Sequence, residues 1–258
     1  MLFGGTLPPE TIPHTTVFRQ HVYHVVNGEI VFPSVTGPIP DRWPALPAGV
    51  AGFYTLYPNP DELLAGKLDG RVRAYLAGAQ PGSMLTAYAE ADGDRPAGGN
   101  FAALGLTQAK LRDVHAHMQA LCAGTHVRYG SVTCGFDAAA PGWSAPGLDF
   151  YGLDIYEPCP PGIMNALNEW RANVSALQPD PVLCIAETNT AAPARRPFWF
   201  AAIFGWLKAY EQTGGGVAAM CTYWNPNGPL SGPWLPGDEA TVAALSLIAQ
   251  AAGAGPPG

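Results

Sequence analysis

Charge is scarce in this chain. Only 13% of its 258 residues are charged, and acidic residues outnumber basic ones, which gives a net charge of -7. Nucleic acids and anionic membranes are bound through basic surfaces, so this balance argues against both as partners. An acidic surface that carries aromatic residues is compatible with neutral or cationic ligands, and sugars are among these.

Cysteine is also sparse. The chain has five cysteines, an odd number, so at least one is unpaired. No pair has the CxxC spacing typical of a structural zinc site. Cys134, Cys184 and Cys221 fall inside apolar, strand-like runs, where free buried thiols are usually found.

Long apolar runs are missing as well. No stretch approaches the roughly 20 apolar residues of a membrane-spanning helix. The N-terminus lacks a basic region followed by an apolar run, so it does not resemble a secretory signal. We therefore expect a soluble, cytoplasmic protein, or a secreted one supplied without its leader. Apolar residues still make up 48% of the chain, which is enough for a sizeable core.

Eight strand-like runs recur along the chain, with helix-like segments between most of them. The runs are Leu2 to Gly5, Glu29 to Val35, Val50 to Tyr57, Met84 to Glu90, Val127 to Cys134, Leu148 to Tyr156, Val182 to Glu187 and Val217 to Trp224. One expected helix begins at Pro60. The others cover Asp69 to Leu76, Thr107 to Ala123, Ile163 to Leu177, Pro197 to Gln212 and Glu239 to Ala252. The segment from Pro13 to His24 is ambiguous.

This alternation predicts an α/β fold, a single (β/α)8 TIM barrel over residues 1–252, with a flexible tail over residues 253–258. An open doubly wound sheet is the alternative fold. It calls for a glycine-rich phosphate loop after the first strand, and Gly4-Gly5 is followed instead by Thr-Leu-Pro-Pro. No internal repeat or linker divides the chain.

Two of the apolar runs end on a glutamate. Glu187 closes the run from Val182, and Glu90 closes the run from Met84. Barrel enzymes carry their chemistry at the carboxyl ends of the strands, and glycoside hydrolysis needs two carboxyl groups on either side of one bond. We therefore predict Glu90 and Glu187 as catalytic residues. Asp92 and Asp94 stay open as alternatives for the acid.

Three strand ends resemble glycoside hydrolase family 26 and its relatives in clan A. The segment from Asp149 to Tyr156 is similar to a DxxGxDxY pattern, the segment from Pro181 to Glu187 is similar to the nucleophile strand, and Tyr223-Trp224 is similar to the last strand. The chain departs from family 26 at Ala89, where a histidine usually precedes the acid, so we extend the resemblance to the clan.

The resemblance implies a retaining double displacement without a cofactor. Glu90 is the implied acid/base and Glu187 the implied nucleophile. Tyr156 is expected to donate a hydrogen bond to Glu187, and Trp224 to form the floor of the subsite. Retention also predicts a separation of about 5–5.5 Å between the two carboxyl groups.

Further residues near the expected mouth are assigned to carbohydrate binding. They are Tyr57, Tyr88, Trp143, Asp154 and Asn189. Trp43 and Trp234 also lie near strand ends and are undecided between sugar stacking and packing, whereas Trp199 and Trp206 fall in a helix and are expected in the core.

No metal site is predicted. His115 and His117 lie two residues apart on a helix, so their side chains point in different directions. Two other functions stay open, a catalytically silent barrel that binds glycans and a metal-dependent barrel hydrolase. The sequence leaves undecided the sugar, the linkage, endo or exo action and the oligomeric state.

Overall fold

The computed structural model describes residues 1–5, 17–21, 24–26, 29–31, 39–93, 101, 104–135, 142–157, 162–190, 192–223 and 239–253. Its strands are β1 (Leu2–Gly5), β2 (Val17–His21), β3 (His24–Val26), β4 (Glu29–Val31), β5 (Ala51–Leu56), β6 (Met84–Ala87), β7 (Arg128–Thr133), β8 (Phe150–Tyr156), β9 (Val182–Asn189) and β10 (Gly216–Thr222). Its helices are α1 (Pro60–Leu64), α2 (Asp69–Leu76), α3 (Gln108–Cys122), α4 (Ile163–Leu177), α5 (Arg196–Gln212) and α6 (Glu239–Gly253), with a 3-10 turn at Pro193–Arg195.

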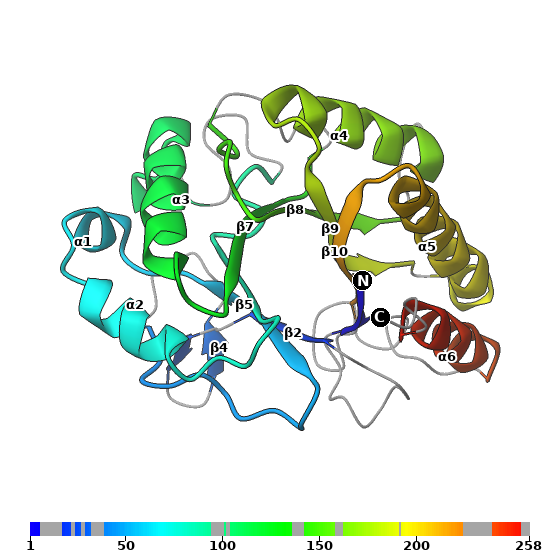
Figure 1. Cartoon of the computed structure of the whole chain (residues 1–258), viewed down its shortest axis with the longest axis horizontal. Helices are drawn as coiled ribbons and strands as arrows, with labels where there is room; N and C mark the ends of the chain where they lie inside the picture. The colour runs from blue at the N-terminus through cyan, green and yellow to red at the C-terminus, as the bar shows by residue number, and fades with distance from the viewer. Residues whose placement is uncertain are drawn as a thin grey trace.

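The sheet is parallel and strongly curved. Strands β5 to β10 follow one another in chain order, and β1 and β2 pair with its two edges and with each other, which closes the ring. The helices lie around the outside of this ring (Figure 1). The predicted α/β architecture with a parallel sheet is therefore confirmed. Among the described residues no helix lies between β7 and β8, so a regular alternation with eight helices stays a prediction.

One strand was assigned wrongly from the sequence. The run from Glu29 was expected in the barrel, but Glu29–Val31 pairs antiparallel with His24–Val26 in a separate two-stranded sheet. The barrel position belongs to β2, inside the ambiguous segment, and β2 pairs with β5. The sequence of β2 is Val-Phe-Arg-Gln-His. It lacks the continuous apolar run that is typical of a buried parallel strand, so the sequence pattern did not identify it.

Local signals explain why the helices begin and end where they do. Asn59 accepts hydrogen bonds from the backbone N–H groups of Asp61 and Glu62 at the start of α1, which Pro60 opens. Thr107 accepts a bond from Lys110 N at 3.2 Å and begins α3, as predicted. Gly124, with φ of +78°, follows the end of α3.

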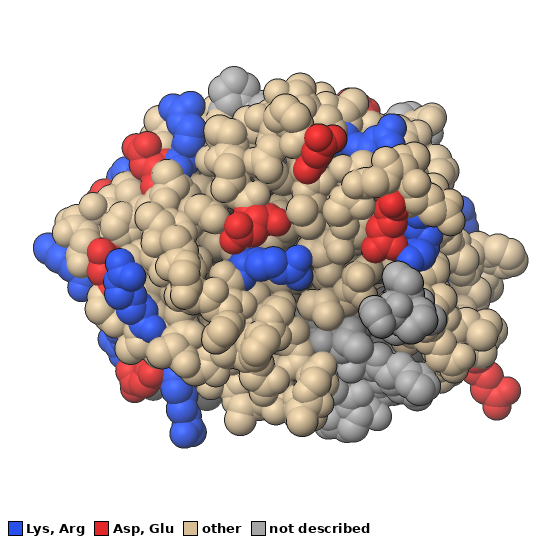
Figure 2. All heavy atoms as spheres, viewed as in Figure 1, with Lys and Arg blue, Asp and Glu red and all other residues tan. Residues whose placement is uncertain are grey.

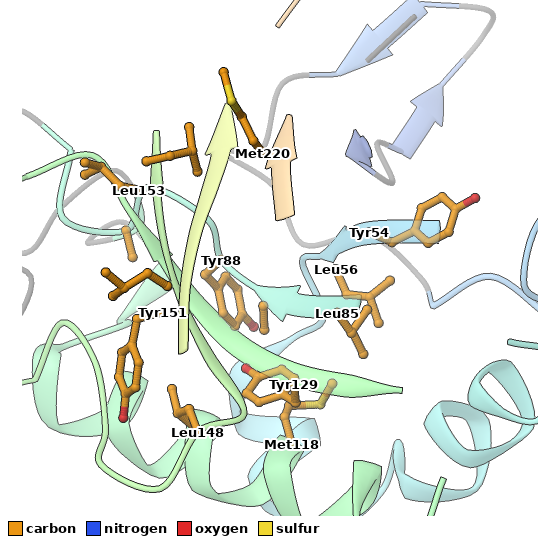
Figure 3. Packing of buried hydrophobic residues seen from close by; sticks show 14 of the residues in the cluster. Tyr54, Leu56, Leu85, Tyr88, Met118, Tyr129, Leu148, Tyr151, Leu153 and Met220 are labelled. Atoms are coloured by element: carbon orange, nitrogen blue, oxygen red, sulfur yellow. The ribbon is translucent and has the colours of Figure 1, made fainter. Parts of the chain in front are cut away.

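Alternate strand residues divide between two apolar clusters. The outer cluster lies between strands and helices, and Figure 3 shows part of it, including Tyr129 of β7 and Met118 of α3. The inner cluster fills the ring, and its strand members include Phe53, Met84, Val132, Phe150, Cys184, Ala186, Ala219 and Cys221. Glycine makes room there, since a Cβ on Gly130 would lie 2.6 Å from the Phe150 ring.

Trp43, Trp199 and Trp206 belong to the outer cluster. Trp199 and Trp206 are both 7% exposed, which confirms the expectation for these two. Trp43 was undecided, and the structure packs it against the rings of Tyr54 and Tyr75.

None of the helices that the structure describes is long and apolar enough to cross a bilayer. Charged side chains are scattered over the face in Figure 2 and form no large patch of one sign.

Candidate active site at the strand ends

A β-bulge in β9 turns Glu187 toward the inside of the ring. Leu153 of β8 pairs with Ile185, but the next residue of β8, Asp154, pairs with Glu187, so Ala186 has no partner there. Cys184 and Ala186 both belong to the inner cluster, and simple alternation would point Glu187 outward. The extra residue reverses the alternation, as bulges beside functional sites commonly do.

The side chains on either side of Glu187 support this orientation. Thr188 faces the helix layer, because its Oγ1 accepts a hydrogen bond of 2.8 Å from the indole N–H of Trp199 in α5. Glu187 faces the other way and is 4% exposed. Its Oε2 accepts a hydrogen bond of 2.7 Å from the hydroxyl of Tyr156, which confirms the contact that the resemblance implied.

Tyr156 stands in a field of carboxyl groups. Burial raises the pKa of the Tyr156 hydroxyl well above its ordinary value of 10. Three neighbouring carboxyl groups raise this pKa further, in decreasing order those of Glu187, Asp154 and Glu90. The hydroxyl therefore stays protonated and can donate to Glu187 throughout the pH range in which enzymes work. Glu90, Asp154 and Glu187 thus all act electrostatically on the hydroxyl of Tyr156.

Asp154 is buried beside Glu187. It is 2% exposed and is the direct cross-strand neighbour of Glu187 in β8. A carboxyl group this deep reaches a ligand less readily than one at the rim. Its predicted contact with substrate stays a prediction, and its visible relation is electrostatic, to Tyr156.

Glu90 is held by a turn and not by a strand. β6 ends at Ala87, three residues before Glu90, although the sequence predicted a strand as far as Glu90. Glu90 has φ of +57° and Tyr88 has φ of +54°, both in the left-handed region that non-glycine residues rarely adopt. Glu90 N donates to the carbonyl of Val132 in β7 at 3.0 Å, which ties the turn to the neighbouring strand.

The rings of Tyr88 and Tyr57 pack beside the turn that carries Glu90. Tyr88 is 1% exposed, its hydroxyl donates to the carbonyl of Pro58, and its ring packs edge-on against Phe101. Tyr57 lies against the same two rings and is 5% exposed. Both the ring and the hydroxyl of Tyr88 thus have protein partners, and its contact with substrate stays a prediction. For Tyr57 the contact with substrate stays a prediction.

Asn189 serves the strand ends. Its side-chain N–H donates to the carbonyl of Tyr223 at 2.6 Å, and its Oδ1 accepts from Thr190 N at 2.7 Å. Asn189 has no exposed surface, and its role in substrate binding stays a prediction. Trp143 is half-buried and packs against the outer cluster, away from the inner face that Glu187 shares. Trp224, Trp234 and Asp94 lie outside the described residues.

Sequence reasoning missed Tyr223. Its ring lies 5.7 Å from that of Tyr156 at an interplanar angle of 83°, and its N–H donates to the carbonyl of Thr188 at 2.9 Å. Tyr223 therefore places a second aromatic ring beside Tyr156 at the end of β9. The sequence signal for Tyr223 is its position directly before Trp224, to which alone a binding role was assigned.

The histidine pair on α3 has separate partners. His115 is buried, and its Nδ1 lies 2.9 Å from the Tyr129 hydroxyl, whereas Nε2 of His117 lies 2.7 Å from Oδ1 of Asp69. Burial lowers the pKa of His115 from 6.5 to about 4, against the opposing effect of a hydrogen bond to the Trp143 backbone. Within the part of the chain that is described, no three His, Cys, Asp or Glu side chains gather in a group suited to a metal ion.

Comparisons with known proteins identify a shared fold. No protein-family model matches the sequence, and no curated protein sequence matches it. A glycoside hydrolase family 128 (subgroup I) endo-β-1,3-glucanase from Amycolatopsis mediterranei, in complex with laminaritriose, is 14% identical with a TM-score of 0.56. The alignment covers 96% of this chain and 98% of that one.

Two further solved structures are similar. A point mutant of the same glucanase, in complex with laminarihexaose, is 12% identical over 95% of this chain and 97% of that one, with a TM-score of 0.57. A family 5 xyloglucan-specific endo-β-1,4-glucanase from a metagenomic library, in complex with cellotriose, is 13% identical over 91% and 84%, with a TM-score of 0.53. At these identities the likeness shows a common fold over nearly the whole chain.

Proposed function

We propose that this protein is a retaining glycoside hydrolase of the clan A type, built on a (β/α)8 barrel with residues 1–252 as one catalytic domain. Glu187 is the nucleophile that attacks the anomeric carbon. Glu90 is the acid that protonates the leaving oxygen and the base that later activates water. No cofactor is required. The observation that carries the proposal is the hydrogen bond from Tyr156 to Glu187 inside a shared carboxyl field.

The arrangement suits each half of the reaction. Donation from Tyr156 fixes the carboxylate of Glu187 in orientation, which lowers the cost of reaching the reactive geometry. Glu90 lies near other carboxyl groups, and a like charge close by favours the protonated form that an acid needs. As Glu187 loses its charge to the glycosyl bond, Glu90 is free to ionise and act as a base.

A β-linked glucan is the substrate class that we propose. The support is the fold shared with an endo-β-1,3-glucanase and an endo-β-1,4-glucanase, both bound to glucan oligomers in the structures that resemble this chain. Tyr156 and Tyr223 supply aromatic surface beside the nucleophile, and sugar rings pack their C–H faces on such planes. Which of the two linkages is cleaved follows from the loops between the strand ends.

Product stereochemistry tests the proposal directly. The purified chain is incubated with laminarin, xyloglucan and cello-oligosaccharides, and the first anomer released is identified by NMR before it mutarotates. We expect hydrolysis of at least one β-glucan with retention. A retaining mechanism requires a separation of about 5–5.5 Å between the two carboxyl groups. Inversion would contradict the direct attack by Glu187, because it calls for a separation of roughly 6.5–9.5 Å and a water between.

A catalytically silent glycan-binding barrel is the second candidate. Its support is the depth of the carboxyl groups, since Asp154 and Glu187 are almost fully buried. Binding of laminari- or cello-oligosaccharides by calorimetry, without any turnover over days, would favour this function over the hydrolase.

A further inference from the structure

Asp92 lies two residues beyond Glu90 and binds the end of the neighbouring strand. Its Oδ1 accepts a hydrogen bond of 3.0 Å from Cys134 N, and its Oδ2 accepts one of 2.6 Å from Gly135 N. The thiol of Cys134, a weak donor, lies 3.8 Å from Oδ1. Both oxygens of Asp92 therefore hold the backbone that directly follows β7.

The same turn is tied to β7 once more, at Glu90 itself. Glu90 N donates to the carbonyl of Val132. The turn is therefore hydrogen-bonded to the end of β7 at two points, through Glu90 N and through the carboxylate of Asp92. Glu90 itself has φ of +57°, in the left-handed region that is unfavourable for a non-glycine residue. Such a conformation persists only where the surroundings determine it fully. The aromatic packing of Tyr88 secures one side of the turn, and Asp92 secures the other.

We propose that Asp92 is a positioning residue for Glu90. This inference rests on the proposed function, in which Glu90 is the acid/base. Hydrogen bonds to an ionised acceptor are about twice as strong as neutral ones, which suits Asp92 to hold a strained turn. It is not suited to be the acid itself. Both of its oxygens accept from N–H groups, an arrangement that favours the ionised form and offers no proton to a leaving group.

The test is the dependence of turnover on the leaving group. In Asp92→Asn one oxygen becomes an amide N–H₂ that faces a backbone N–H, so one of the two bonds is lost. A shift of Glu90 by about 1 Å is then expected to lower kcat about 100-fold on a natural β-glucan oligomer. An aryl glycoside with an activated leaving group needs little protonation, so its kcat falls far less. KM is unchanged for both.

The matched control is Asp149→Asn, at the other end of the same strand. Asp149 Oδ2 accepts from Tyr129 N at 2.9 Å, and its Oδ1 accepts from Gln119 at 3.1 Å, so it holds the beginning of β7 by the same chemistry. Loss of this support lowers thermal stability. It reduces the amount of folded enzyme equally for every substrate, so the ratio of the two activities stays that of the wild type.

A double mutant separates positioning from direct action. If Asp92 works through Glu90, Asp92→Asn has no further effect on the activity ratio in a Glu90→Ala background. An additive loss would make Asp92 an acid in its own right and overturn the inference. So would an Asp92→Asn variant whose activity on both substrate types falls equally or not at all.

Two measurements keep the outcome independent of folding yield. Amide hydrogen exchange at Cys134 and Gly135 is expected to accelerate in Asp92→Asn and not in Asp149→Asn. Should Asp92→Asn fail to fold, Asp92→Ser keeps one acceptor and is scored by the same ratio. A wild-type chain that hydrolyses none of the glycosides would reject the proposed function itself, whereas an active wild type with an unchanged ratio in the variant rejects only the role of Asp92.

Discussion

The two glutamates of the site are held by different devices. Glu187 lies inside β9, and a single extra residue turns it inward without placing it in the left-handed region. Glu90 lies beyond the end of β6 in a turn with two left-handed residues, tied to β7 by hydrogen bonds. A residue inside a sheet is fixed by the ladder on both sides. A residue in a strained turn depends on a few specific contacts, so its position is easier to disturb.

The difference matches the demands of the two roles. A nucleophile must be aimed at one carbon, and a rigid strand with a donor such as Tyr156 provides that. An acid/base has to release and take up a proton and serve two successive steps. We therefore expect substitutions on the Glu187 side to affect all substrates, and substitutions on the Glu90 side to affect them selectively.

Replacement of the nucleophile has the largest expected effect. Glu187→Ala removes the group that forms the covalent intermediate, and kcat should fall by about 10⁴-fold or more, on good and poor leaving groups alike. The control is Glu169→Ala, on the exposed side of α4, which should retain full activity. Near-normal turnover by folded Glu187→Ala would remove the assignment and with it one half of the comparison.

Replacement of the acid should be selective. Glu90→Ala is expected to lower kcat about 10²- to 10⁴-fold on substrates with poor leaving groups, the range that general acid catalysis contributes. Activated aryl glycosides should lose much less, since their leaving groups depart without a proton. Steady-state kinetics on both substrate types measure this. Equal losses would mean that Glu90 only positions the substrate.

The phenol that orients the nucleophile comes next in size. Tyr156→Phe removes a hydrogen bond to a charged group, worth about 1.5–3 kcal/mol, so kcat should fall roughly 10- to 100-fold on every substrate. Tyr151→Phe is the matched control. Tyr151 lies on the opposite side of β8, with its hydroxyl 2.9 Å from Ala145 O and 2.6 Å from Gln178 Oε1, so its loss should lower stability and leave kcat unchanged. A leaving-group dependence in Tyr156→Phe would blur the distinction between the two sides.

The smallest expected effect is on acid stability, on the Glu90 side. His115 supports Tyr129, whose hydroxyl also interacts with the backbone of Ala87 at the end of β6. The pKa of His115 is about 4 in the folded protein and 6.5 ordinarily, so its neutral form stabilises the fold above pH 6.5. This contribution is lost as the pH falls from 6.5 toward 4, by about 2 kcal/mol between pH 7 and 4.5.

Urea unfolding of the wild type and of His115→Gln at these two pH values measures the loss. The variant has no buried imidazole to protonate, so its stability should fall less over the same interval. An equal fall in both proteins would show that other groups govern the response to acid.

Much of this molecule was predictable where the pattern is local. The limits of α2 and α4 match the sequence expectation, because the apolar spacing of a helix is read within a few residues. Glu187 and its contact with Tyr156 were found because they lie within strands whose order along the chain sets which of them are neighbours.

What failed depends on pairing between distant segments. Nothing in Val17–His21 alone shows that β5 will pair with it, and the more apolar run at Glu29 was chosen instead. The left-handed turn at Glu90 arises from hydrogen bonds to β7, some 40 residues further along the chain. The hydrogen bonds of Tyr88 to Pro58 and of Asn189 to Tyr223 also join segments about 30 residues apart, and a local pattern does not show them.

The bulge at Ala186 divides β9 into two independent halves. Below it, Val182 and Cys184 point into the apolar filling of the ring, and above it Glu187 belongs to the reactive end. Side chains in the lower half can be exchanged to adjust packing without changing the direction of the carboxylate. A deletion or insertion of one residue between them would turn the carboxylate toward the helices. In this strand the number of residues is thus a stricter constraint than their identity, and homologous chains with altered lower halves but an unaltered length should keep the same chemistry.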